Sequence, residues 1–329
     1  MSEGGLTVLD GTHLRSLNLF LPELNGSVTG AQLLEIADSK ASSSLFGLSL
    51  PQKVKASALS RVTAGAGDDD VTFRKKELAG EKASKVLSDY ISAIADGLKD
   101  DPLVVSILDG NTLKLFLEDE DDYAMLAENL FTDLDIEDKG KIRKSEIRKA
   151  LVQMGVEMGI PPFAEFPLLN DILKKHGAEG QQELGQAQFA ELLQPILQET
   201  ADALTEKHIV VIQNIKVVNG SDLRKLLADE KQFNDVIQRV LQEKKSGKDE
   251  LGKTELIRSF LEKHGKDLGL PPVESNEAAT LLYDAVFSEV ESEESPAQVE
   301  DEFREYVKDV LKKFAEQLEA NPIYCDLDN

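Results

Sequence analysis

The most informative segment of this chain is Asp135-Ile136-Glu137-Asp138-Lys139-Gly140-Lys141-Ile142-Arg143-Lys144-Ser145-Glu146. An acid stands at its first and third positions, a glycine at its sixth, an aliphatic residue at its eighth and a glutamate at its twelfth. At this spacing a twelve-residue loop presents oxygen ligands to calcium, a hard cation. The stretch therefore predicts a cation-binding loop between two helices.

The positions that would surround the metal are Asp135, Glu137, Lys139, Lys141 and Glu146. Asp135 and Glu137 would give carboxylate oxygens, Lys141 its backbone carbonyl, and Glu146 both oxygens of its side chain. Lys139 at position five departs from the pattern, because an ammonium group carries only donors and cannot ligate a cation. The loop also holds as many bases as acids, so it predicts weak calcium binding or a loop kept only for packing.

Helical spacing surrounds this loop. Leu126 and Leu130 lie four residues apart before it, and Ile147 and Leu151 lie four apart after it, which gives one apolar stripe per helix. A second loop, 177–188, has Leu184 at its eighth position but lacks acids at its ends. We expect it to bind no metal and to pair Leu184 with Ile142, as in an EF-hand pair.

The same pattern recurs along the chain. Asp109-Gly110-Asn111-Thr112-Leu113 matches Asn219-Gly220-Ser221-Asp222-Leu223, and Gly159-Ile160-Pro161-Pro162 matches Gly269-Leu270-Pro271-Pro272. A more eroded copy begins at Leu9-Asp10-Gly11-Thr12-His13-Leu14. Similarity at a fixed period indicates tandem units, and we place them at 1–105, 106–215 and 216–329.

The expected fold is all-α, built from tandem EF-hand pairs whose loops are mostly degenerate. In the last unit the loop 244–255 and its partner around Val299 lack a ligand set, and in the first unit 64–70 would be a degenerate loop or link. Only the loop 135–146 is near the consensus. The apolar runs 104–105 and 209–212 are short connectors that fit either strands or helix starts.

With these features the chain resembles the plant family of EF-hand calcium sensors that interact with sucrose-nonfermenting-related protein kinases. The resemblance covers most of the chain, including the opening 6–11 and the stretch 131–150. It implies a regulator that binds calcium (Ca2+) and a serine/threonine kinase, and that has no catalysis of its own. The loop 135–146 is the one loop to which the family's calcium binding can be assigned, and Lys139 is the residue in it that departs from the family's ligand pattern.

Composition limits the partners and the compartment. The formal net charge is −24, which argues against nucleic acid or anionic membranes and favours a basic protein surface or divalent ions. A single cysteine, Cys325, fits a reducing compartment. The chain shows no apolar run of membrane-spanning length and no signal peptide, so we expect a cytoplasmic or nucleocytoplasmic protein.

Three methionines besides Met1 all flank the near-consensus loop: Met125, Met154 and Met158. Flexible methionine side chains line the grooves of calcium sensors, so these three predict a partner groove, and filling of a small core is the other interpretation. No catalytic constellation is recognisable, so we expect no enzyme. Two hypotheses follow: a calcium-modulated regulator that binds a partner protein, and a calcium-independent interaction scaffold with the same fold.

Overall fold

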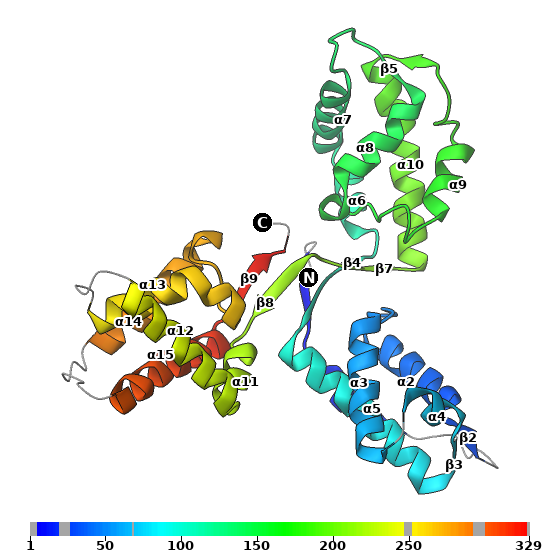
Figure 1. The fold of residues 1–329 in the computed structure, drawn as a ribbon. Helices are drawn as coiled ribbons and strands as arrows, with labels where there is room; N and C mark the ends of the chain where they lie inside the picture. Colours follow the sequence, from blue (N-terminus) through cyan, green and yellow to red (C-terminus); the bar gives the residue numbers. More distant parts are fainter. Residues whose placement is uncertain (1–4, 20–26, 68, 247–251, 292–299, 328–329) are drawn as a thin grey trace. The chain divides into compact units, whose positions relative to one another are not determined.

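The computed structural model describes residues 5–19, 27–67, 69–246, 252–291 and 300–327 (Figure 1). Most of them lie in helices, so the mostly helical class is confirmed. Short strands connect the helical parts. The two apolar runs of uncertain type are both strands, β4 (Leu103–Leu108) and β7 (Ile209–Ile212).

One order of elements appears three times along the chain. Each copy opens with a strand, an Asp-Gly or Asn-Gly pair and a short helix, and it closes with a long helix and another strand. The long helices each span 21 residues: α5 (Gly80–Asp100), α10 (Gln186–Glu206) and α15 (Glu300–Ala320). Residues at helical spacing on each long helix are buried, so this helix is the centre of its copy.

The glycine of the opening pair has the same role in all three copies. Its φ is positive, a conformation that other residues resist, and a Cβ there would collide with a carbonyl oxygen of the long helix. The glycines and their alanine neighbours are Gly11 on Ala95, Gly110 on Ala201 and Gly220 on Ala315. The preceding side chain caps the short helix by accepting the N–H of the residue two positions on, as for Asp109 and Asn111 at 3.0 Å. The repeated motif therefore fixes a close backbone contact.

The contacts divide the chain into two compact units. Unit 1 comprises Met1–Leu9, Gly30–Pro51 and Val104–Gln213, and unit 2 comprises Asp10–Thr29, Gln52–Leu103 and Asn214–Asn329. The three consecutive domains that the sequence predicts correspond to the three copies of the element order and not to these two units. Their boundaries at 105 and 215 stay a prediction.

Unit 1 contains a three-stranded sheet in the order β1 (Thr7–Leu9), β4, β7. β4 and β7 are antiparallel, with Val105 opposite Ile212 and Leu108 opposite Ile209. β4 thus closes the first copy of the element order and opens the second. The remaining elements of unit 1 are α2 (Gly30–Ser44), α6 (Asn111–Glu118), α7 (Glu120–Leu134), β5 (Ile142–Arg143), η1 (Lys144–Glu146), α8 (Ile147–Met154), η2 (Val156–Met158), α9 (Leu168–Lys175), β6 (Glu183–Leu184) and α10.

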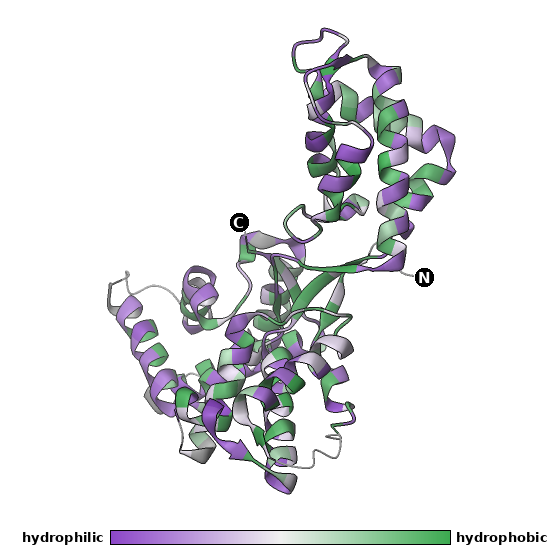
Figure 2. Cartoon of the chain, turned by 90° about the vertical axis from the view of Figure 1, so that its right-hand side faces the viewer, coloured by the Kyte–Doolittle hydropathy of each residue, from purple (hydrophilic) through white to green (hydrophobic). Residues whose placement is uncertain are grey.

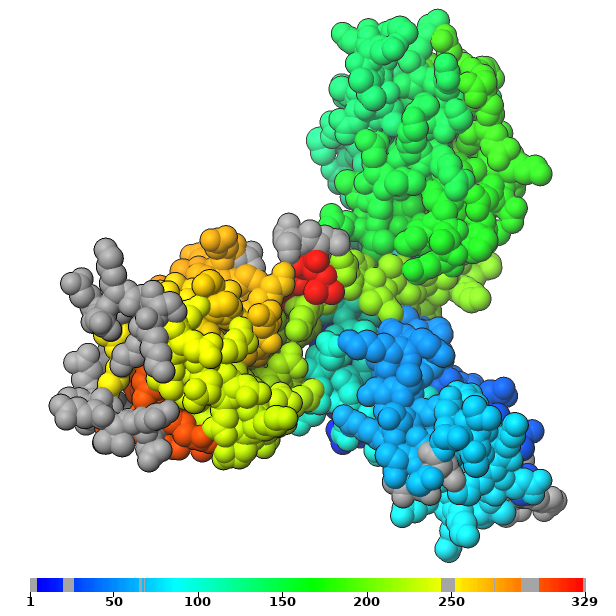
Figure 3. Space-filling view, viewed as in Figure 1, coloured from blue at the N-terminus to red at the C-terminus, as the bar shows by residue number. Residues whose placement is uncertain are grey.

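The core of unit 1 lies among α6 to α10. The rings of Phe131 and Phe189 are 5.8 Å apart at its centre, and Tyr123 donates its hydroxyl to the Ala190 carbonyl at 2.5 Å. Burial raises the pKa of Tyr123. Green apolar and purple polar residues alternate along these helices in Figure 2. In the space-filling view of Figure 3, where colour follows the sequence, the same helices form a continuous green surface. Amphipathic spacing therefore accounts for this core.

Unit 2 is built in the same way around α5 and α15. Its other elements are α1 (Thr12–Arg15), β2 (Val28–Thr29), α3 (Gln52–Ala66), α4 (Asp70–Lys75), β3 (Glu77–Leu78), β8 (Ile215–Val218), α11 (Ser221–Ala228), α12 (Glu230–Ser246), α13 (Lys253–His264), η3 (Gly265–Leu268), η4 (Val273–Ser275), α14 (Glu277–Glu291) and β9 (Ile323–Asp326). β8 and β9 are antiparallel, with Val217 opposite Tyr324. The rings of Tyr283 and Phe314 meet edge to face at 4.9 Å in the core.

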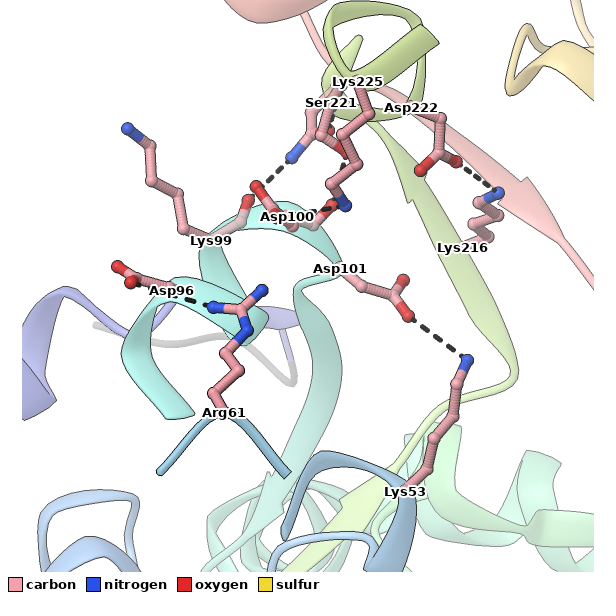
Figure 4. Close-up of polar contacts among 11 residues, drawn as sticks. Lys53, Arg61, Asp96, Lys99, Asp100, Asp101, Lys216, Ser221, Asp222 and Lys225 are labelled. Carbon is pink, nitrogen blue, oxygen red and sulfur yellow. Dashed lines mark hydrogen bonds and ion pairs between the residues drawn. The ribbon is translucent and has the colours of Figure 1, made fainter. Parts of the chain in front are cut away.

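A group of polar contacts joins the end of α5 to the start of α11 within unit 2 (Figure 4). Ser221 donates its hydroxyl to the Asp100 carbonyl at 2.6 Å, and Lys225 pairs with the Asp100 carboxylate at 3.0 Å. Asn219 donates to the Lys99 carbonyl at 3.0 Å. Ser221 and Asn219 thereby satisfy carbonyl groups that a helix end leaves without intrahelical partners, and Lys225 adds an ion pair to the Asp100 side chain.

The segment 64–70 is expected from the sequence to be a degenerate loop or a link. α3 ends at Ala66 and α4 begins at Asp70, so the segment contains the connection between these two helices. The strand that pairs with Val28 is β3, through Leu78. Asp69 caps α4 by accepting the Thr72 N–H at 2.7 Å, which explains why a new helix begins at Asp70.

Two of the predicted loops extend into residues that the structure does not describe. The loop 244–255 includes 247–251, and Val299 belongs to 292–299; both ranges lie outside the described residues. Among the helices that are described, none is long and apolar enough to cross a membrane.

Candidate functional site

The loop 135–146 has a tightly turned backbone. Asp135 accepts the Lys139 N–H on one carboxylate oxygen at 3.0 Å and the Gly140 N–H on the other at 2.6 Å. Asp138 and Gly140 both have positive φ, at 50° and 65°, which explains the glycine at position six. The first residue of the loop therefore folds the loop around its own side chain.

The second half of the loop is held by a two-stranded sheet with two residues in each strand. β5 and β6 are antiparallel, with Ile142 opposite Leu184 and Arg143 opposite Glu183. Ile142 and Leu184 are both buried in the core of unit 1. The predicted pairing of Ile142 with Leu184 is confirmed. It places position eight at the core and leaves the first six positions at the surface.

The charged side chains of the loop pair with one another and with α8. Glu137 and Lys139 form an ion pair, and this contact lowers the pKa of Glu137 and raises the pKa of Lys139. Glu146 pairs with Lys149 at 2.6 Å, and only 22% of its side chain is exposed. An ammonium group thus stands beside each of the acids at positions three and twelve.

These contacts test how well the residues fit calcium. The turned backbone fits a calcium loop, and the acids at positions one, three and twelve are of the right type, but the structure does not gather these three carboxylates around one point. Lys139 does not fit, so the set supplies fewer oxygens than the six to eight that calcium takes. Within the described part of the chain, no group of three or more His, Cys, Asp or Glu side chains is gathered as a metal cluster.

The three methionines are not on one surface. Met154 is 2% exposed and belongs to the core of unit 1, and Met158 is partly buried against the same core. Met125 is 59% exposed on α7. The core-filling interpretation therefore describes Met154 in this conformation, and a groove that includes it would require the helices to separate.

A pocket that the sequence did not predict lies beside the loop. It has a volume of about 390 Å³, and its lining is Asp133, Leu134, Ile136, Glu146, Arg148, Lys149, Val152 and Gln153. Ile136 is 89% exposed and Val152 is 63% exposed. The available signal was Ile136 at loop position two, an aliphatic residue among charged ones. Val152 gave none, because its exposure depends on how α8 packs.

Comparison with protein-family models, with curated proteins and with solved structures finds no match to this chain.

Proposed function

We propose that this protein is an EF-hand regulatory protein that binds a partner protein in a calcium-modulated way. The observation that supports it is the turn of Asp135 around the Lys139 and Gly140 N–H groups, followed by the pairing of Ile142 with Leu184. This arrangement keeps the backbone of a calcium loop although Lys139 reduces its ligand charge. The resemblance described above makes a serine/threonine kinase the partner to test first.

In this proposal Asp135, Glu137, the Lys141 carbonyl and Glu146 would hold calcium. Bound calcium would supply positive charge at the loop. Glu146 stands at the start of α8 and pairs with Lys149, so any demand on its carboxylate changes the contacts of that helix. Regulation would pass from the loop to α8 and from α8 to the partner surface.

A calorimetric calcium titration in physiological magnesium tests the proposal on the full chain and on Glu146→Gln. We expect a site weaker than the micromolar range of strong sensors, because position five lacks a ligand. The variant removes one of the two oxygens of position twelve, so we expect it to lose the heat of binding. Equal calcium binding in both proteins would contradict the proposal.

The second candidate is a calcium-independent scaffold, and the Lys139–Glu137 ion pair favours it. Here the ammonium of Lys139 takes the part of the cation and the loop serves packing alone. Partner binding that is the same in calcium and in chelator, with no heat of calcium binding up to about a millimolar, would support this candidate and exclude the first.

A further inference from the structure

The end of helix α5 in the first copy is held by the start of helix α11 in the last copy (Figure 4). Ser221 donates its hydroxyl to the Asp100 carbonyl at 2.6 Å, although the two residues are 121 positions apart in the sequence. Asn219 donates to the Lys99 carbonyl at 3.0 Å. Lys225 pairs with the Asp100 carboxylate at 3.0 Å. These five residues form the α5–α11 joint, which connects two copies that are not neighbours along the chain.

Two of the three donor groups of the joint are absent from the matching positions of the middle copy. Asn219 is matched by Asp109 there, and by Asp10 in the first copy, and a carboxylate has no hydrogen to donate. Lys225 is matched by Leu115, whose side chain is 63% exposed. An aspartate caps the short helix as Asn219 does, since all three residues accept the N–H two positions on. The repeated motif therefore needs neither the amide nor the lysine, and in the last copy both groups serve the joint.

The apolar core of the last copy is complete without the first copy. Among the residues that the structure describes, the buried side chains of this core run from Val218 to Cys325, and none of them comes from α5. α5 packs on α1 and α3 of its own copy. Compact parts of a chain move relative to one another unless their interface is large and apolar. The joint can therefore open while both cores stay intact.

The ion pair of the joint is partly open to solvent. The Asp100 side chain is 32% exposed and that of Lys225 is 58% exposed. Asp96, one turn earlier on α5, pairs with Arg61 of α3 within the first copy, so its charge is held on the other side of the joint. Opening the joint costs one ion pair and two hydrogen bonds, and water can replace all three. Because the ion pair is exposed, added salt weakens it.

From these observations we infer that the α5–α11 joint is a salt-sensitive latch that holds the first and last copies together and opens without unfolding either of them. In the closed state Ser221 is buried and donates its hydroxyl to α5. In the open state this hydroxyl, the Asn219 amide and the Lys225 ammonium turn to water. The latch gives the chain two conformations. It needs neither calcium nor a partner protein, so it is independent of the proposed function.

The test measures one distance across the joint by double electron–electron resonance on the full chain. Spin labels are attached to Lys85→Cys on α5 and Leu281→Cys on α14, both at exposed positions, and Cys325→Ala removes the native thiol. We expect one dominant distance at about 20 mM salt and, at about 1 M salt, a second distance whose population rises at least about threefold. The far-UV circular dichroism should stay the same. A single distance at both salt concentrations, or a loss of helix at high salt, would overturn the inference.

Two variants taken from the middle copy locate the latch. Asn219→Asp keeps the helix cap but replaces the donor to Lys99 with an acceptor, and Lys225→Leu removes the ion pair. Folding should tolerate both residues, as it does in the middle copy, and each should raise the population of the second distance at low salt about fivefold. Lys216→Leu is the matched control, because Lys216 pairs with Asp222 inside the last copy at 3.4 Å. Distances that Asn219→Asp and Lys225→Leu leave unchanged, or an equal change in Lys216→Leu, would overturn the inference.

An exchange of charges separates the latch from a general loss of stability. Asp100→Lys alone places two ammonium groups across the joint, so it should open the latch further than Lys225→Leu does. Asp100→Lys combined with Lys225→Asp restores opposite charges, and we expect the double variant to recover at least about half of the population with the dominant distance. No recovery in the double variant would show that these two positions do not meet across the joint, and the inference would then be overturned.

Discussion

The helix pair α7 and α8 of the middle copy and the helix pair α12 and α13 of the last copy share their buried residues and helix caps but differ in their exposed residues. Tyr123 and Phe233 are both buried four residues after a capping aspartate. On the outside, α12 carries Lys231 and Arg239, and Arg239 pairs with Asp267, whereas α7 carries acids alone.

The difference shows which features the frame requires. Buried residues are of the same kind in both copies because each helix must cover its 21-residue neighbour. Exposed residues differ freely, since surface substitutions usually change stability little. The exposed residues of α7 and α8 are therefore the part of the middle copy in which a specific function is easiest to seek.

The largest expected effect tests the shared frame. Gly110→Ala and Gly220→Ala would each force a side chain into the left-handed region and against the carbonyl oxygen of Ala201 or Ala315. We expect each to lower the free energy of unfolding by about 3 kcal/mol or more, through strain and overpacking together. Denaturant unfolding measures this. Gly140→Ala is the control: its φ is also positive, but a Cβ there meets no atom within 4 Å, so its cost should be smaller. Similar losses in all three variants would show that close packing is not what the repeated glycine provides.

A smaller effect is expected on the calcium affinity of the loop 135–146. Lys139→Asp removes the ammonium at position five and adds a carboxylate, so calcium affinity should rise by about tenfold or more. Lys141→Gln is the matched control, because position seven would use its backbone carbonyl and not its side chain. Calorimetry on both variants decides. An unchanged affinity in Lys139→Asp would mean that position five does not limit the loop.

The smallest effect is expected at a contact that the middle and last copies share, a glutamate that accepts hydrogen bonds from a lysine and a histidine. Glu199 accepts hydrogen bonds from Lys175 and His176, and Glu243 accepts them from His264 and Lys263. These donors lower the pKa of both glutamates from 4.5. Glu199→Gln and Glu243→Gln should therefore each cost about 0.5 to 1 kcal/mol at neutral pH.

The sign of the pH dependence follows from the lowered pKa values. A carboxylate whose pKa is lower in the folded state stabilises the fold above its unfolded pKa, and that contribution is lost as the pH falls through the folded pKa. The gap in unfolding free energy between the wild type and either variant should thus close below about pH 4.5. A gap that does not narrow at all as the pH falls below about 4.5 would contradict this account.

The sequence was sufficient for some features because their signals are local. Helical spacing identified the mostly helical class, and the loop spacing predicted that Ile142 would pair with Leu184. The strand β3, which pairs with Val28 through Leu78, was not predicted, since a two-residue strand is too short to show an alternating pattern.

The surface around the pocket could not be predicted from the sequence. Whether Val152 is exposed depends on which side of α8 packs inward, and the engagement of Arg148 depends on Asn170 and Phe163, which follow much later in the sequence. The ion pair of Lys139 with Glu137 is the reverse case, because the loop spacing alone showed that an ammonium would stand among the ligand positions.

The exposed position of Lys139 also has a genetic consequence. Either lysine codon becomes an asparagine codon by a change in its third base, and asparagine offers a carbonyl oxygen where lysine offers none. Lys139 has no role in the core, and its backbone N–H contact with Asp135 would survive the exchange. A population could therefore gain a fuller ligand set through a single point mutation, without selection for a compensating change elsewhere in the protein.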